Sequence, residues 1–396
     1  MFFLTPTYLK QGRSLLKEAR KLLSYKRDVW SKETISEYQG YLDGLLAALR
    51  ARDRRGVADA GNALAGWARV NHPVPSDAGW RENVEVFLVA IVIALGVRTY
   101  FLQPFGIPTG SMQPTLNGII GTKLPGEVPT VFVRIFDGVW HGRASVDLVA
   151  KEDEIIRSVQ EIKSPLPFIS HVPGFRSGFF TRTEIATERG NQYIVSEGLS
   201  NVTRLFGVMQ GASFKKGEPI ARGYFDAGDH VFVDKFTYHF RNPRRSEVFV
   251  FSTLGISMLN PAGAPSQFYI KRLGGVPGDT MRIDPPNLYI NGKLAEEQGF
   301  RKVMSGTRTP WSTGYRGYGN GAERPNNDQQ FYVDRAYNLG TPTATVTLPP
   351  KTYYALGDNS YNSLDSRFWG TVPERNVMGK AVVVYWPFGK HLGPVW

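Results

Sequence analysis

The 396-residue sequence contains no cysteine. Disulfide bonds, thiol nucleophiles and cysteine-ligated zinc are therefore excluded. Its six histidines form no H-E-x-x-H motif and show no metal-ligand spacing, so we expect no metal and no cofactor. The G-x-S-x-G elbow, the P-loop and the Asp-Thr-Gly and Asp-Ser-Gly signatures are also missing. A hydrolase built from this chain would need a hydroxyl nucleophile with some other base.

Acidic residues are fewer than basic ones, and the net charge is +12. Such a balance suits nucleic acid or an anionic membrane surface. The sequence has no zinc finger, no RNA-binding signature and no Lys/Arg run interleaved with aromatics, so we expect no nucleic-acid partner. The 42 glycines, 26 prolines and 13% aromatic residues favour strands, turns and loops in the second half of the chain.

Residues 1–80 are predicted to form an α-helical segment, because apolar residues recur there at helical spacing. They include Leu9, Leu16, Leu42, Leu45, Leu64 and Trp67. Residues 1–82 also carry 14 lysines and arginines. If a membrane span follows, the positive-inside rule predicts that this segment is cytoplasmic and that the rest of the chain lies outside.

One apolar run is a candidate for a membrane span. Val86–Val97 is uninterrupted but shorter than the roughly 20 residues that a bilayer requires, so a buried core helix fits it as well. Apolar residues resume after Arg98, in Tyr100–Leu102, and Glu85 and Arg98 stand where long side chains reach the interface. We predict a transmembrane helix over residues 84–103.

The remainder, residues 104–396, is predicted to be a β-rich domain with insertions at about 118–227 and 296–350. Within the first insertion, Lys151–Ile162 is a candidate helix. Asn291-Gly292 is a hairpin signal. Short apolar runs separated by turn residues predict strands at His230–Phe236, Val248–Phe251, Gln267–Leu273, Thr280–Ile283, Leu288–Ile290, Thr343–Leu348, Tyr353–Leu356 and Lys380–Trp386.

Prolines and glycines surround Ser111 in the segment Gln103–Leu116, directly after the apolar run. By composition alone, a proline-rich linker with a solvated serine explains this segment. Lys271 stands among Phe268, Ile270 and other apolar residues. Taken alone, it is also compatible with an ordinary strand lysine that points to water.

Four sequence blocks, in the same order as in a known family, change this interpretation. They are Ile107–Leu116 (IPTGSMQPTL), Gly228–Tyr238 (GDHVFVDKFTY), Phe268–Asp279 (FYIKRLGGVPGD) and Gly357–Gly370 (GDNSYNSLDSRFWG). Together they resemble the nucleophile, second-strand, base and final blocks of bacterial type I signal peptidases. The resemblance implies a mainly β catalytic domain of the signal peptidase fold, with antiparallel sheets, after a transmembrane helix and an N-terminal α-helical segment.

The resemblance also implies a Ser–Lys dyad, with Ser111 as nucleophile and Lys271 as general base. Serine needs a nearby base, and lysine can serve only when neutral. The pKa of a free lysine is about 10.4, and burial among apolar neighbours lowers such a pKa. Arg272 beside it cannot serve, because arginine stays charged.

Further positions match the family's supporting residues. Thr109 matches the residue whose hydroxyl joins the nucleophile's backbone N–H in the oxyanion hole. Ser363 matches the serine that orients the lysine amine, and Asp365 and Arg367 match an ion pair beside it. Gly357 matches a glycine packed close behind the site. The positions that match the lining of two shallow substrate pockets are Phe105, Ile107, Pro108, Tyr269 and Ile270.

The chain departs from the family pattern in places. Residues 118–227 separate the first two blocks, which usually lie within about ten residues of each other in the family. Ser360 and Tyr361 stand where an Arg-Asp pair is common, and Ser246-Glu247 stands where a Gly-Asp turn is expected. The helical segment over residues 1–80 is also unlike the family's usual extra span.

The resemblance therefore implies a membrane-bound serine endopeptidase that cleaves signal peptides from exported precursor proteins. It would be a single-pass protein of the bacterial inner membrane, in contact with lipid, with a cytoplasmic N-terminus and a periplasmic peptidase domain. Two alternatives remain: an inactive membrane-anchored peptide-binding module of the same fold, and a self-cleaving Ser–Lys peptidase. The apolar run and the lack of a DNA-binding helix pair argue against the second.

Overall fold

The computed structural model describes residues 6–71, 78–163, 181–256, 259, 267–306, 316–320, 337–389 and 391–396. The chain divides into two compact units, Met1–Val92 and Ile93–Trp396. All strand pairs among the described residues are antiparallel. The expected fold class, antiparallel sheets after an N-terminal helical segment and an apolar helix, is confirmed.

The first unit contains a small helical bundle of α1 (Thr7–Lys26), α2 (Lys32–Ala51) and α3 (Arg54–Asn71). Its apolar stripes meet in one core, where the ring of Trp67 packs 4.8 Å from that of Tyr38. Ser31 caps α2 by accepting a hydrogen bond from Thr34 N at 3.2 Å, which satisfies one free N–H of the first turn. The periodic leucines thus form a bundle core, as their spacing predicts.

The apolar run forms α4 (Ala78–Tyr100). Its segment Gly79–Tyr100 is 22 residues long with a mean hydropathy of 1.7 and none of it buried. Among the described residues it alone is long and apolar enough to cross a membrane. The helix begins before residue 84 and ends at Tyr100, and Leu102 already belongs to the first strand.

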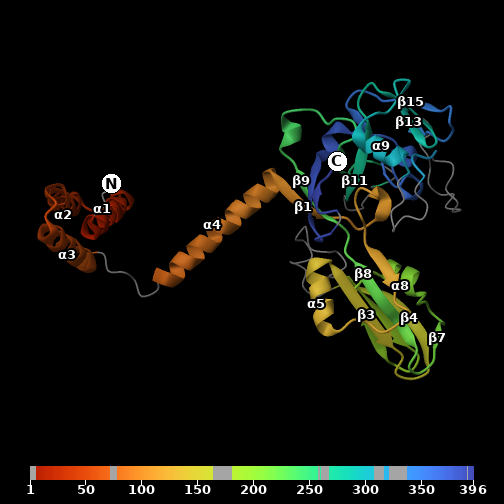
Figure 1. Ribbon diagram of the computed structural model, residues 1–396, viewed down its shortest axis with the longest axis horizontal. Coiled ribbons are helices and arrows are strands. Elements are labelled where there is room, and N and C mark those ends of the chain that lie inside the picture. Colours follow the sequence, from red (N-terminus) through yellow and green to blue (C-terminus); the bar gives the residue numbers. More distant parts are fainter. Residues whose placement is uncertain are drawn as a thin grey trace. The chain divides into compact units, whose positions relative to one another are not determined.

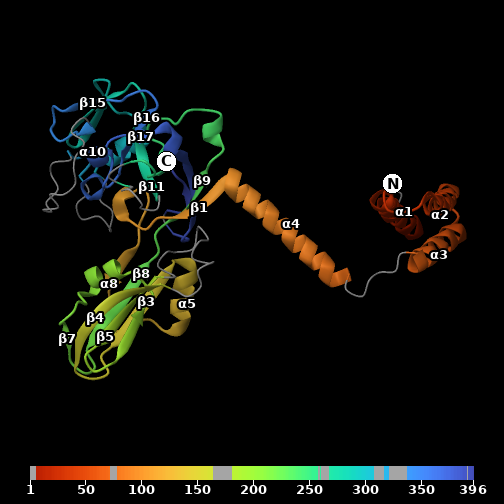
Figure 2. The same cartoon turned by 180° about the vertical axis from the view of Figure 1, so that it is seen from behind.

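The main sheet brings together strands from distant parts of the chain (Figures 1 and 2). In spatial order it contains β1 (Leu102–Gly106), β9 (His230–Asp234), β18 (Val377–Trp386), β10 (Val248–Ser252), β11 (Phe268–Gly275), β16 (Thr352–Leu356) and β17 (Val372–Pro373), with β19 (Gly393–Pro394) paired to β18. Alternate side chains enter two apolar clusters. One contains Val248 and Val250, and the other contains Phe249 and Phe251.

A smaller sheet follows in the order β14 (Lys293–Leu294), β13 (Asn287–Ile290), β12 (Thr280–Asp284) and β15 (Thr345–Thr347). The helix α9 (Gln298–Met304) packs on it through Phe300 and Val303. Asn291 and Gly292 have φ angles of 51° and 77° and turn the chain between β13 and β14, which confirms the hairpin prediction. In the second insertion, residues 307–315 and 321–336 lie outside the described residues.

Residues 118–227, called the lobe from here on, form sheets and a core of their own. One sheet has the order β2 (Ile120–Lys123), β8 (Pro219–Asp226) and β3 (Arg143–Val149). The other has the order β6 (Gln192–Val195), β5 (Thr181–Thr187), β4 (Glu154–Lys163) and β7 (Ser213–Phe214). The lobe also contains the helices α5 (Val131–Trp140) and α8 (Leu199–Phe206). Ile156, Ile185 and Phe225 are fully buried in its core, so the insertion is a folded body and not a long loop.

The candidate helix over Lys151–Ile162 is wrong, because Glu154–Lys163 forms strand β4. The segment is rich in isoleucine and valine, whose branched side chains fit a strand better than a helix. Its backbone pairs with Thr181–Thr187, so a contact with a later segment decides its conformation. The charged residues at its start obscured this pattern.

Candidate active site

Ser111 lies on a short 3-10 turn, η1 (Gly110–Met112), after the end of β1. Its side chain is 8% exposed. Met112 and Leu116, which flank the turn, are completely buried in the cluster that lines one face of the main sheet. The turn is therefore anchored by its apolar neighbours, which leaves the serine hydroxyl at the edge of the core.

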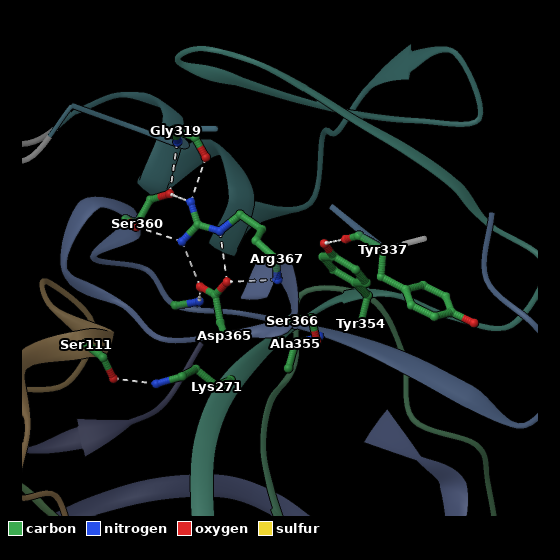
Figure 3. A network of polar contacts seen from close by, with 11 residues as sticks. Ser111, Lys271, Gly319, Tyr337, Tyr354, Ala355, Ser360, Asp365, Ser366 and Arg367 are labelled. Atoms are coloured by element: carbon green, nitrogen blue, oxygen red, sulfur yellow. Dashed lines mark hydrogen bonds and ion pairs between the residues drawn. The ribbon is translucent and has the colours of Figure 1, made fainter. Parts of the chain in front are cut away.

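Lys271 projects from β11, the strand between β10 and β16. It is 5% exposed, and its neighbour across the ladder is the buried Phe249. Its Nζ donates a hydrogen bond to Ser111 Oγ at 2.5 Å (Figure 3). Two side chains 160 positions apart in the sequence thus meet in a site that is nearly closed to water.

Thr109 and the five predicted pocket residues differ in their surroundings. Thr109 Oγ1 is 3.5 Å from Ser111 Oγ, and its residue is exposed. Tyr269 packs against the apolar cluster that contains Phe249, whereas the serine turn belongs to the other cluster. The centroid of the Tyr269 ring lies 5.8 Å from Lys271 Nζ. Pro108 is exposed. The three predicted pocket residues that share one apolar cluster with the serine turn are Phe105, Ile107 and Ile270.

Gly357 packs directly against the serine turn. A Cβ atom at this position would lie 2.0 Å from Ser363 Oγ and 2.8 Å from the carbonyl oxygen of Ser111, so no side chain fits there. Ser363 is fully buried, and its Oγ has no hydrogen-bond partner among the described residues. Asn359 fixes the turn further, because its N–H donates to the Ser111 carbonyl at 3.0 Å.

Asp365 and Arg367 form a buried ion pair at 2.8 Å at the start of the short helix α10 (Ser366–Trp369) (Figure 3). Burial raises the pKa of Asp365, but the Arg367 guanidinium and the N–H of Gly357 outweigh it and hold that pKa below its ordinary value. Arg367 also donates to Ser360 Oγ at 2.7 Å and to the Gly319 carbonyl at 2.6 Å. The second insertion therefore contributes backbone to this network.

Sequence reasoning missed the most enclosed ionic contact near the site. Arg272 and Asp358 are both 0% exposed and form a bidentate pair, with Nε–Oδ1 at 2.7 Å and Nη2–Oδ2 at 2.6 Å. Thr115 Oγ1 donates to Asp358 Oδ2 at 2.5 Å, and Arg272 also donates to the Ser246 carbonyl. Each of the three side chains belongs to a different block, and the available signal was an arginine among the apolar residues of the Phe268–Asp279 block.

The block Gly228–Tyr238 holds the backbone of the serine block and of the residue after it in place. Asp229 Oδ2 accepts from Asn117 N at 2.7 Å, and the Asp229 carbonyl accepts from Ile107 N at 2.9 Å. A Cβ atom on Gly228 would lie 1.7 Å from the Ile107 carbonyl oxygen. Glycine at 228 is therefore needed for the close approach, although the lobe separates the two blocks in the sequence.

Residues 223–386 match the family model described as signal peptidase, peptidase S26. This region belongs to the signal peptidase family. It contains Lys271, Gly357, Ser363 and the Asp365–Arg367 pair, whereas Ser111 and most of the lobe precede it.

Two similar proteins agree with this assignment. The chain is 31% identical over 172 residues to signal peptidase I of Leptolyngbya laminosa, and the match covers 43% of this chain and 66% of that protein. It is 30% identical over 189 residues to signal peptidase I of Pseudomonas aeruginosa, covering 41% of this chain and 61% of that protein. A crystal structure of a signal peptidase I from Enterococcus faecalis is 25% identical to this chain, with a TM-score of 0.22. The match covers 35% of this chain and 97% of the chain in that structure. The chain thus spans less than two thirds of the length of either relative.

Replacing Arg272 by methionine should lower the free energy of unfolding by about 3–5 kcal/mol, because Asp358 would be left buried and unpaired. Arg189→Met is the matched control, since Arg189 pairs with Glu152 at 2.8 Å where both side chains are more than half exposed. That change should cost no more than about 1 kcal/mol. Denaturant unfolding followed by tryptophan fluorescence measures both, and equal losses would contradict the assigned importance of the buried pair.

Proposed function

We propose that this chain is a membrane-bound serine endopeptidase that cleaves signal peptides from exported precursor proteins with a Ser–Lys dyad. The contact between Lys271 Nζ and Ser111 Oγ carries the proposal. Membership of residues 223–386 in the signal peptidase family supports it from an independent direction. The contact supplies the two groups that acyl transfer needs, a hydroxyl and a base within hydrogen-bonding reach.

In this mechanism the neutral Lys271 amine takes the proton of Ser111 as Oγ attacks the scissile carbonyl. The resulting ammonium then gives its proton to the departing amine, and water hydrolyses the acyl-enzyme with the amine again as base. Lys271 is 5% exposed, and burial disfavours the charged form of an amine. Asp365 is the nearby carboxylate, but its oxygens already accept from Arg367 and from Gly357 N.

The developing oxyanion needs donors close to the nucleophile. The backbone N–H of Ser111 and the hydroxyl of Thr109 are the proposed pair, and the Thr109 hydroxyl lies 3.5 Å from Ser111 Oγ. Ser363, whose hydroxyl has no other partner among the described residues, would form a hydrogen bond with the amine. Asp365 and Arg367 hold the backbone of this block and do not take part in proton transfer.

An extended signal peptide would bind as an added strand. β1 is the last strand at its end of the main sheet, so its outer edge pairs with no described strand and offers backbone groups to a peptide. Phe105 on this strand, with Ile107 and Ile270, supplies an apolar surface beside the dyad. We propose that these residues, with Pro108 and Tyr269, accept small side chains on the amino-terminal side of the cut.

The proposed location is the bacterial inner membrane. α4 has the length and hydropathy of a single span. The 14 basic residues in 1–82 favour a cytoplasmic N-terminus, which puts the unit after α4 on the periplasmic side. An inactive peptide-binding module is the weaker alternative, because Ser111 and Lys271 are both retained and in contact.

Ser111→Ala should lower kcat for an exported precursor by at least about 10³-fold, and Lys271→Met by at least about 10²-fold, because nucleophile and base are lost. Lys271→Arg should be equally inactive, since arginine does not deprotonate. Ser200→Ala and Lys293→Met are matched changes away from the dyad. Normal turnover by Ser111→Ala or Lys271→Met in purified protein would end the proposal.

A phenylalanine placed just before the cut in the precursor should lower kcat/KM by at least about 10²-fold, because a large ring overfills a small pocket. The control moves the same phenylalanine one residue earlier. In an extended peptide that side chain points to the opposite face, so cleavage should continue. If both precursors are cleaved at the same rate, the pocket assignment fails.

Because the chain contains no cysteine, single cysteines introduced into it can test the orientation in the membrane. A cysteine introduced at Met209 should react with a membrane-impermeant maleimide in intact spheroplasts, whereas one at Tyr25 should react only after permeabilisation. Both positions are exposed, at 62% and 77%, so access and not burial decides the outcome. The reverse labelling pattern would show that the orientation is inverted.

A further inference from the structure

The helix α5 of the lobe exposes an unusual amount of apolar surface. None of its residues is buried, and Phe132 is 86% exposed. Soluble proteins rarely leave such a contiguous apolar patch open to water, and those that do use it for binding. The large apolar residues exposed on this helix are Val131, Phe132, Val133, Ile135, Phe136, Val139 and Trp140.

The helix turns its polar side toward the protein. At about 100° per residue, the seven apolar side chains share one broad face, and Arg134, Asp137 and Gly138 share the other. Asp137 accepts from His141 at 3.0 Å and lies 3.7 Å from Arg143, which starts the adjacent strand β3. Gly138 also faces this strand, since a Cβ atom there would lie 3.5 Å from the Arg143 carbonyl. The usual arrangement, with the apolar face inward, is therefore reversed.

α5 is fastened to the main sheet through its last turn. Trp386 Nε1 donates to the Val139 carbonyl at 2.8 Å, and Phe388 N donates to the Trp140 carbonyl at 2.9 Å. The rings of Trp140 and Phe388 pack with their centroids 4.9 Å apart. Trp386 belongs to β18, which is two strands from the strand that carries Lys271. A ligand bound by α5 would therefore fix the orientation of the catalytic sheet.

The chemistry of the exposed face fits lipid better than a protein partner. Protein interfaces carry about one hydrogen bond per 100–200 Å², but this face has only the indole of Trp140 as a polar group. Arg134 lies on the polar side of the helix, and its exposed side chain can reach lipid phosphates while the apolar residues enter the acyl region. Ten residues extend about 15 Å, too short to cross a bilayer but suited to lying along its surface.

We propose that α5 lies in the membrane interface as a second attachment point, with its apolar face among the acyl chains and Arg134 at the headgroups. This attachment belongs to the lobe and would hold the peptidase unit at a fixed angle to the bilayer. The proposal uses the membrane anchoring proposed above but not the catalytic dyad. It can therefore fail while the Ser–Lys mechanism stands, and the reverse also holds.

The cysteine-free full chain, reconstituted in phosphatidylcholine–phosphatidylglycerol vesicles, allows single fluorophores to report on the environment. An environment-sensitive dye on Phe132→Cys should emit at shorter wavelength and lose roughly half of its emission or more to acyl-chain spin-labelled lipid. The matched control is Ile194→Cys, an apolar residue of the same lobe that is 49% exposed. Its dye should be quenched by iodide, present on both sides of the bilayer, and not by the spin label.

Dye on Val89→Cys, in the middle of α4, separates the two proposals. If position 89 is quenched by spin-labelled lipid and position 132 is quenched by iodide as strongly as position 194, α4 anchors the chain and the proposal for α5 is wrong. Protection of position 132 from both quenchers would mean that protein covers the face, which also overturns the lipid assignment. Lack of lipid quenching at both 89 and 132 would remove the anchoring and the second attachment together.

Discussion

The ion pair between Arg272 and Asp358 organises the proposed active site. Two charges with no exposure to water are costly unless each is paired and hydrogen-bonded, and here the pair is bidentate at 2.7 and 2.6 Å, with Thr115 and the Ser246 carbonyl as further partners. These contacts join the serine block, the lysine block and the final block. Because Lys271 precedes Arg272 on the same strand, fixing the arginine also fixes the register that carries the amine to Ser111.

Close backbone contacts at two glycines also hold the serine block in place. Gly228 lies against the Ile107 carbonyl and Gly357 lies against the Ser111 carbonyl, and neither position has space for a Cβ atom. The Asp365–Arg367 pair then holds the segment behind Gly357 through the hydrogen bond from Gly357 N to Asp365 at 2.9 Å. The serine turn is thus held by backbone contacts on both sides, while the hydroxyl itself remains available for chemistry.

The lobe adds a separate folded body to this framework without interrupting it. It leaves the main domain after η1 and returns at β9, and its two ends are closed by the pairing of Asn117 with Asp229. It has a hydrophobic core of its own. The outward apolar face of α5, fastened to β18, gives the lobe a means of orienting the sheet at a lipid surface.

By itself the sequence determined the local features: the periodic leucines of the N-terminal bundle, the apolar helix, the Asn291-Gly292 turn, most strands of the main sheet and the blocks that contain Ser111 and Lys271. The helices, the turn and the strands follow from the spacing of residues that are close in the chain, and the two blocks follow from their resemblance to signal peptidases. Only the tertiary structure decided that 154–163 is a strand, that Arg272 and Asp358 pair, and that Tyr269 packs on the opposite cluster from Ile107. Each of these depends on partners distant in sequence, which local pattern cannot specify, because pairing and burial are properties of the assembled sheet.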